Sequence, residues 1–230
     1  MKSYLYGIKR SVPVFFGFLP VAVTFAIMAG SAGLGKMETV LMSVFVFAGA
    51  SQIMAVGQIM AGSGAVSIII ATFVLNLRHV IMSTCIFKRV RVKNILLRFA
   101  CALSVTDEGF ALITTEDEEK CDIPFLLGII TLTYLSWIFG TVVGVVASSI
   151  LPQIVADSFG IALYALFLAL IVPDIKGSLR LLATVLITAA LNCALCMLIE
   201  SSQAIIISTL VGALIGAFIV EDKAEEGVLA

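Results

Sequence analysis

Long apolar runs separated by short polar stretches dominate this chain. A helix crosses the hydrocarbon core of a bilayer in about 20 residues, and most of these runs reach or approach that length. The pattern therefore predicts an all-α polytopic membrane protein, a bundle of about seven or eight transmembrane segments with some of them broken or re-entrant. All belong to one membrane domain over residues 1–230, and they lie near residues 12–30, 39–61, 64–87, 99–115, 124–147, 159–172, 179–199 and 203–220.

Composition supports this class and narrows the functions. Of 230 residues, 61% are hydrophobic and 13% are charged, whereas soluble domains carry about 25% charged residues. So few charges cannot cover a soluble globule, and without a basic domain the sequence argues against a nucleic-acid partner. The five cysteines are an odd number and lie mostly in apolar runs, so we expect free, packed thiols. Cys193 and Cys196 have the spacing of a redox or metal pair but lack flanking ligands.

The charged stretches predict the orientation. Residues 88–98 form a basic loop with five of the 14 lysines and arginines, and the positive-inside rule places such a loop in the cytoplasm. Residues 116–123 form an acidic loop, which we expect at the opposite face, and residues 221–230 form a charged tail.

Segment 64–87 brings this orientation into conflict with the N-terminus. If it crosses the membrane once, a cytoplasmic basic loop forces Lys2, Lys9 and Arg10 to the outside. If it is re-entrant or broken, both basic regions lie inside, as the rule prefers. We therefore favour the re-entrant or broken arrangement for segment 64–87, and keep the single crossing as the alternative.

Two polar clusters interrupt the apolar sequence, Asn76-Leu77-Arg78-His79 and Thr106-Asp107-Glu108-Gly109. A charge at bilayer depth costs about 2.5–3.5 kcal/mol on insertion scales, and such groups usually line substrate or proton pathways. We expect Arg78 to pair with Asp107. The alternative is that this pair only locks two helices together. Because neighbouring helical residues point about 100° apart, we expect one member of each pair (Arg78 with His79, Asp107 with Glu108) to meet its partner across the bundle while the other faces a cavity.

The same residues suit a zwitterionic amino acid. Arg78 can bind the substrate carboxylate, Asp107 or Glu108 can accept from its ammonium group, and His79 with Glu108 can relay a proton. Asn76, which shares a helix face with His79, is also expected to bind substrate, as are Gly49 and Gln52. Gly49 and Gln52 lie at the centre of segment 39–61, where residues 47–50 offer an apolar pocket with small walls. Gly17 and Pro20 are expected to break or kink the first segment.

Several short strings occur together in a recognisable order. These are Gly17-Phe18-Leu19-Pro20, Phe47-Ala48-Gly49-Ala50-Ser51-Gln52, Asn76-Leu77-Arg78-His79, Thr106-Asp107-Glu108-Gly109-Phe110-Ala111-Leu112, Tyr134-Leu135-Ser136-Trp137 with Gly140, and Ala169-Leu170-Ile171-Val172-Pro173. The chain resembles the AzlC family over nearly its whole length. Met82 and Gly109 depart from the residues that are frequent in that family, which leaves the substrate range open.

The resemblance implies a function. It implies export of branched-chain amino acids across a bacterial plasma (inner) membrane by a multi-pass, proton-coupled secondary carrier without a cofactor. It also implies a small membrane partner of the AzlD family and leaves homo-oligomers open.

Two other classes of function remain open. One is an intramembrane enzyme that uses the Asp, Glu and His cluster on a metal or water, although metal sites normally need three protein ligands and the chain has one histidine. The other is a passive or regulatory membrane subunit. The sequence contains no Gly-x-x-x-x-Gly-Lys-Ser/Thr loop for ATP.

Overall fold

The computed structural model describes residues 1–148, 168, 172, 175–199 and 201–219, and among these the regular elements are all helices. The predicted segment 159–172, apart from two residues, and the tail 221–230 lie outside the described residues. Four described helices are long and apolar enough to cross a membrane, namely α1, α4, α7 and α9. The bounds are α1 Lys2–Ser31, α2 Lys36–Phe45, α3 Gly49–Met60, α4 Ala65–Arg89, α5 Ile95–Leu103, α6 Asp107–Thr114, a 3₁₀ turn Glu118–Lys120, α7 Ile123–Ala147, α9 Leu179–Cys196 and α10 Ser201–Ile219.

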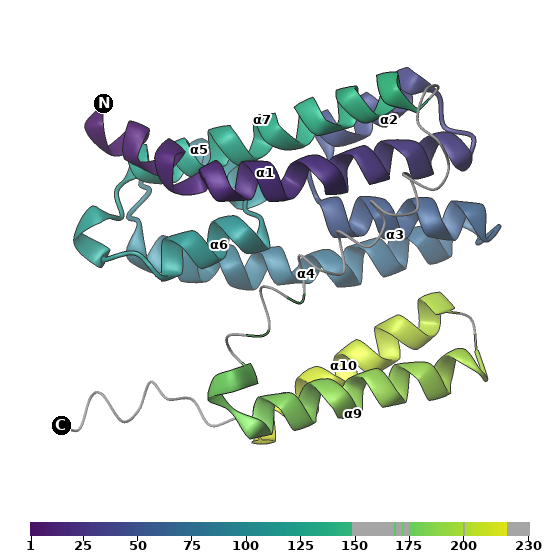
Figure 1. Cartoon of the computed structure of the whole chain (residues 1–230). Helices are drawn as coiled ribbons and strands as arrows, with labels where there is room; N and C mark the ends of the chain where they lie inside the picture. Colours follow the sequence, from purple (N-terminus) through teal and green to yellow (C-terminus); the bar gives the residue numbers. More distant parts are fainter. Residues whose placement is uncertain (149–167, 169–171, 173–174, 200, 220–230) are drawn as a thin grey trace.

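Helices α2 and α3 form a pair that enters and leaves at the same end of the bundle. Helices α1 and α4 run in opposite directions (Figure 1). The α2 helix begins five residues after the end of α1, and α3 ends five residues before the start of α4. Both outer ends of the pair therefore lie at one end of the bundle, and its turn at residues 46–48 lies deep inside. At this turn Phe47 adopts a φ of +39°, a left-handed conformation that is uncommon for a bulky residue.

Helices α5 and α6 form a second such pair, at the opposite end. The α5 helix begins six residues after Arg89. At the far end of the pair, the Arg89 guanidinium donates to the carbonyls of Ile113 and Glu116 at 3.3 and 3.0 Å. The Asn94 side chain caps the start of α5, and the Thr106 hydroxyl caps α6 by accepting from the Gly109 N–H at 3.1 Å. These two caps mark where α5 and α6 begin. Between the two helices, at residues 104–106, the chain turns back.

The observed helix bounds correct three predictions made from the sequence. The segments predicted near 39–61 and 99–115 are not single spans, because each consists of two short helices that turn back. Segment 64–87 is neither broken nor re-entrant, because α4 continues as one helix from Ala65 to Arg89. The α1 helix likewise continues from Lys2 to Ser31 through Gly17 and Pro20. Proline removes one hydrogen bond, but here it does not end the helix.

The two pairs belong to two units of inverted topology. The α1 and α4 helices end at residues 31 and 89, α2 and α5 end at 45 and 103, and α3 and α6 begin at 49 and 107, a constant offset of 58 residues. In each unit a long helix is followed by a re-entrant pair, and the long helices run in opposite directions (Figure 1). Inverted repeats of this kind recur in secondary transporters, with the substrate site between the repeats.

The re-entrant α2–α3 pair removes the orientation conflict. Because this pair does not cross, α1 and α4 are the only crossings between the N-terminus and the basic loop, and the two basic regions share one end of the bundle, here called the basic end. The acidic loop 116–123 lies at this end too, because Glu116 contacts Arg10 and Arg89. Its predicted location at the opposite face is therefore wrong.

Glycines bring α1 and α7 into close contact along their length. A Cβ on Gly140 would lie 2.7 Å from the Ala22 Cβ, and one on Gly144 would lie 2.7 Å from the Ala26 Cβ. Such close approach is typical of small residues spaced four apart on facing helices. At the C-terminal end, Gly212 faces Thr188 in the same way between α10 and α9. The α7 helix thus fixes α1 as one wall of the bundle, while the re-entrant pairs fill its interior.

The re-entrant arrangement predicts the side of the membrane on which each loop lies. We expect cysteines at Met37 and Ala61 to react with an impermeant maleimide from the outside of intact cells. We expect cysteines at Lys93 and Glu119 to react only in inside-out vesicles, because the positive-inside rule predicts that the basic loop lies in the cytoplasm. These positions are exposed, whereas Val90 in the same basic loop is 1% exposed and would report poorly. Labelling of Met37 and Ala61 from different sides would show instead that α2 and α3 cross the membrane.

Candidate functional site

A small cavity lies where the tips of the two re-entrant pairs meet. Its volume is about 30 Å³, which is room for one or two water molecules and too little for an amino acid. The first turns of α3 and α6 and the middle of α4 form most of its wall. Helix α1 adds Phe18 and Val21, and α7 adds Trp137. The lining residues are Phe18, Val21, Phe47, Ala48, Gly49, Ala50, Arg78, His79, Thr106, Asp107, Glu108 and Trp137.

The predicted pair of Arg78 and Asp107 is confirmed as a contact. The Arg78 Nη1 lies 2.7 Å from the Asp107 Oδ2, and each side chain is 28% exposed. Asp107 is the first residue of α6, so its carboxylate also lies at the favourable, positive end of that helix. The Arg78 Nε is buried and has no hydrogen-bond partner within the described residues, which leaves one donor of the guanidinium available to a ligand.

His79 and Glu108 line the same cavity as Arg78 and Asp107. The expected split is confirmed in part: Arg78 and Asp107 meet, and His79 and Glu108 face a cavity, but the paired residues line that cavity as well. The chain begins α6 at Asp107, so the first two residues of this helix both adjoin the cavity. Glu108 is 8% exposed, and the His79 Nε2 is buried without a hydrogen-bond partner within the described residues.

The first turn of α3 is held in place by α7. Any Cβ on Gly49 would lie 2.6 Å from the Trp137 Cη2. Gln52 is fully buried and does not line the cavity. Its Oε1 accepts from the Trp137 Nε1 at 3.1 Å and from the Ala48 N–H at 3.2 Å. Gln52 therefore positions the cavity wall, whereas Gly49 forms part of it.

Asn76 and the Gly17–Pro20 stretch are less directly involved. Asn76 is not among the cavity residues, and its Oδ1 is buried without a partner within the described residues. Gly17 and Pro20 also lie outside the lining set, although Phe18 and Val21 belong to it. Within the described residues, no three His, Cys, Asp or Glu side chains are grouped as metal ligands.

The sequence did not assign Phe18, Val21, Thr106 or Trp137 to the site. Trp137 could have been assigned, since it is the only tryptophan and follows Tyr134 in one of the strings that carry the family resemblance. Phe18 packs edge-to-face against Trp137 with ring centroids 5.6 Å apart. The Tyr134 hydroxyl donates to the Val44 carbonyl at 2.6 Å, so it satisfies backbone at the end of α2.

Comparison with known proteins identifies the family. The model of the AzlC protein family matches residues 13–151, more than half of the chain. The chain belongs to the AzlC family. The matched region includes every residue that lines the cavity, and it includes both re-entrant pairs, so the site lies in the part of the fold that defines this AzlC-family member.

Several relatives are membrane proteins. The chain is 35% identical over 175 residues to an uncharacterized membrane protein of Archaeoglobus fulgidus, covering 74% of this chain and 75% of the relative. It is 29% identical over 196 residues to the Escherichia coli inner membrane protein YgaZ, covering 82% and 80%. A Bacillus subtilis protein named branched-chain amino acid transport protein AzlC is 24% identical over 139 residues, 58% of this chain and 53% of that one. No solved structure matches the chain.

Gly49 and Gly57 form a matched pair for testing the packing at the cavity. Gly49→Ala should lower the free energy of unfolding by about 1–3 kcal/mol because the new Cβ overlaps Trp137, and the larger Gly49→Val should lower it further. A Cβ on Gly57, in the same helix, meets nothing within 4 Å, so Gly57→Ala should be neutral or stabilising. Thermal unfolding in detergent measures both, and equal effects would show that Trp137 does not confine Gly49.

The Arg78–Asp107 contact predicts that changing the charge of either residue destabilises the protein and that reversing both charges restores part of the stability. Arg78→Ala and Asp107→Ala should each lower the free energy of unfolding by about 2–3 kcal/mol, because each leaves a charge without its partner. Combining Arg78→Asp with Asp107→Arg should give a more stable protein than either reversal alone. Thermal unfolding of the three reversal variants tests this. A double reversal no better than its halves would show that the two residues are not partners.

Proposed function

We propose that this AzlC-family protein is a secondary transporter subunit that exports branched-chain amino acids across a bacterial inner membrane. The observation that supports this most strongly is the position of the cavity, between the tips of two re-entrant pairs that enter from opposite ends. Transporters with inverted repeats bind substrate at such an interface, near the bilayer midplane, with broken helices directing their N-termini at anionic groups.

The cavity offers complementary partners for a zwitterionic amino acid. The N-terminus of α3, at Gly49 and Ala50, carries no acidic residue in its first turn, so its amides and Arg78 together suit a carboxylate. The N-terminus of α6 already carries two carboxylates, Asp107 and Glu108, which suit the ammonium group. The substrate is thereby oriented with its carboxylate towards α3 and its amino group towards α6.

The apolar part of the wall selects the side chain. Phe18, Val21, Phe47 and Trp137 present carbon surfaces between the two helix N-termini. Each methylene group buried there contributes about 0.8 kcal/mol, so leucine, isoleucine and valine should bind more tightly than alanine.

Transport requires the cavity to enlarge. At about 30 Å³ it excludes an amino acid, so the structure represents a closed state of the site. A substrate carboxylate competes with Asp107 for Arg78, and this favours a second arrangement of the re-entrant pairs. His79 and Glu108, beside the same pair, carry the exchanged proton in this mechanism.

A small AzlD-like membrane partner is part of the proposal. The tips of both re-entrant pairs also line a surface groove of about 470 Å³ against α7, where Phe45 is 81% exposed. Irregular backbone at membrane depth is tolerated where protein or a water-filled cavity covers it, and not against lipid. A partner helix in this groove supplies that cover.

Counterflow of radiolabelled leucine in proteoliposomes tests the function. We expect leucine, isoleucine and valine to exchange faster than alanine, and Arg78→Ala to abolish exchange. Preparations with and without the co-reconstituted partner show whether this chain transports alone or as a dependent subunit. Absence of exchange in both would reject a carrier and favour a passive, regulatory or enzymatic role.

The pH dependence of counterflow tests the proton relay separately. His79→Gln should keep the protein in the membrane and flatten the pH profile of leucine exchange, because the amide does not titrate. Asn76→Ala, one turn away on α4, is the matched control and should keep the profile of the wild type. An unchanged profile in His79→Gln would exclude His79 from the relay.

A further inference from the structure

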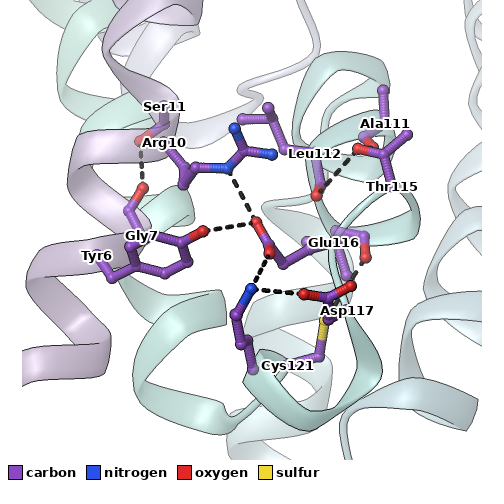
Figure 2. A network of polar contacts seen from close by, with 12 residues as sticks. Tyr6, Gly7, Arg10, Ser11, Ala111, Leu112, Thr115, Glu116, Asp117 and Cys121 are labelled. Carbon is purple, nitrogen blue, oxygen red and sulfur yellow. Dashed lines mark hydrogen bonds and ion pairs between the residues drawn. The ribbon is translucent and has the colours of Figure 1, made fainter.

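A second polar network lies at the basic end, outside the cavity. The Glu116 carboxylate is buried, with its side chain 6% exposed. It accepts from the Tyr6 hydroxyl at 3.0 Å, from the Arg10 Nε at 2.9 Å and from the Lys120 Nζ at 3.4 Å. Figure 2 shows Glu116 between Tyr6 and Arg10 on one side and the turn at Asp117 on the other.

This network joins three elements that are distant in sequence. Tyr6 and Arg10 belong to the first turns of α1, and Glu116 follows the end of α6 by two residues. Arg89, the last residue of α4, donates to the backbone carbonyls of Ile113 and Glu116. The end of α6 is therefore tied to both long helices by charged groups.

The α2–α3 pair is attached differently. Ser43 and Thr141 share a hydrogen bond of 2.8 Å between their hydroxyl oxygens, and the contacts of Gln52 with Trp137 and of Tyr134 with Val44 are also neutral. The re-entrant pairs of the two inverted units are thus equivalent in topology, but charged side chains hold the second pair and neutral hydrogen bonds hold the first. Charged hydrogen bonds contribute roughly twice as much as neutral ones, and water can replace their partners when they open at a membrane surface.

We propose that Glu116 is the latch of the gate at the basic end, and that its release from Tyr6 and Arg10 lets α6 swing away from α1 and opens the cavity to that side. The inference rests on the proposed transport function. Helix α6 has eight residues, so it spans about 12 Å between the latch and Asp107. A short rigid helix transmits a displacement at one end to the other. Opening the latch therefore also strains the Arg78–Asp107 pair.

The ionisation of Glu116 fits this role. Burial raises the pKa of its carboxyl, but the Tyr6 hydrogen bond, the charge of Arg10 and the Lys120 hydrogen bond outweigh burial and lower the pKa below its ordinary value. Asp117, the other acid in the network, has its pKa lowered by Lys120. Glu116 is consequently charged at neutral pH, and the latch is closed in the structure.

Labelling of a cysteine in the cavity tests the latch without using substrate. In a background without the five native cysteines, Ala50→Cys places a thiol in the cavity wall. We expect Glu116→Gln to raise its rate of reaction with an impermeant maleimide about tenfold in inside-out vesicles, since a charged hydrogen bond shifts an equilibrium by about that factor or more. Reaction from the other side of the membrane should not increase.

Three further variants control for indirect effects. Glu119→Gln makes the same charge change at an exposed position of the same loop and should leave labelling unchanged. Tyr6→Phe removes one hydroxyl and should give a smaller rise, which also carries the test if Glu116→Gln does not fold. Joining Arg10→Glu to Glu116→Arg should restore slow labelling. Unchanged labelling in both Glu116→Gln and Tyr6→Phe overturns the latch, even where leucine counterflow succeeds. Faster labelling without any leucine counterflow supports the latch and rejects the transport function.

Discussion

Polar backbone at membrane depth is the constraint on which this fold depends. Each helix end leaves several amide or carbonyl groups without partners, and hydrocarbon cannot satisfy them. The described part of the chain has two such interruptions in the interior of the bundle, at residues 46–48 and 104–106. The long helices α1, α4 and α7 pack around both, with the groove beside α7 as the open side, and local groups such as the Thr106 hydroxyl, the Gln52 amide and the Tyr134 hydroxyl bond to the backbone there.

Enclosure of the breaks brings the functional groups together. The positive ends of α3 and α6 meet across a cavity, and Arg78 reaches it from the middle of α4. The cationic side chain is tolerated there because Asp107 lies 2.7 Å away and removes most of the cost of burying a lone charge. Glycines at the α1–α7 contact and at Gly49 allow this packing, because each stands where another side chain or backbone leaves no space for a Cβ.

The two similar units differ in charge, so the cavity between them has two unlike halves. The units repeat with an offset of 58 residues, yet the first offers an uncharged helix N-terminus to the cavity and the second offers two carboxylates. Their outer ends differ as well, since charged groups fasten α6 and neutral groups fasten α2 and α3. An amino acid has one positive and one negative end, so the unlike halves of the site suit a single orientation of the proposed substrate.

The sequence by itself determined the class of the protein and its important polar residues. A chain with 13% charged residues has to be a membrane protein, and the cost of a buried charge identifies Arg78, Asp107 and Glu108 regardless of the fold. Only the tertiary structure decided which segments cross. A span and a re-entrant pair have the same apolar length, and neither break contains proline, so hydropathy cannot separate them. For the same reason the sequence favoured a broken or re-entrant segment 64–87, which is the continuous helix α4. Trp137 also became a site residue only through packing, because its partners Phe18, Gly49 and Gln52 come from elements that are distant in the sequence.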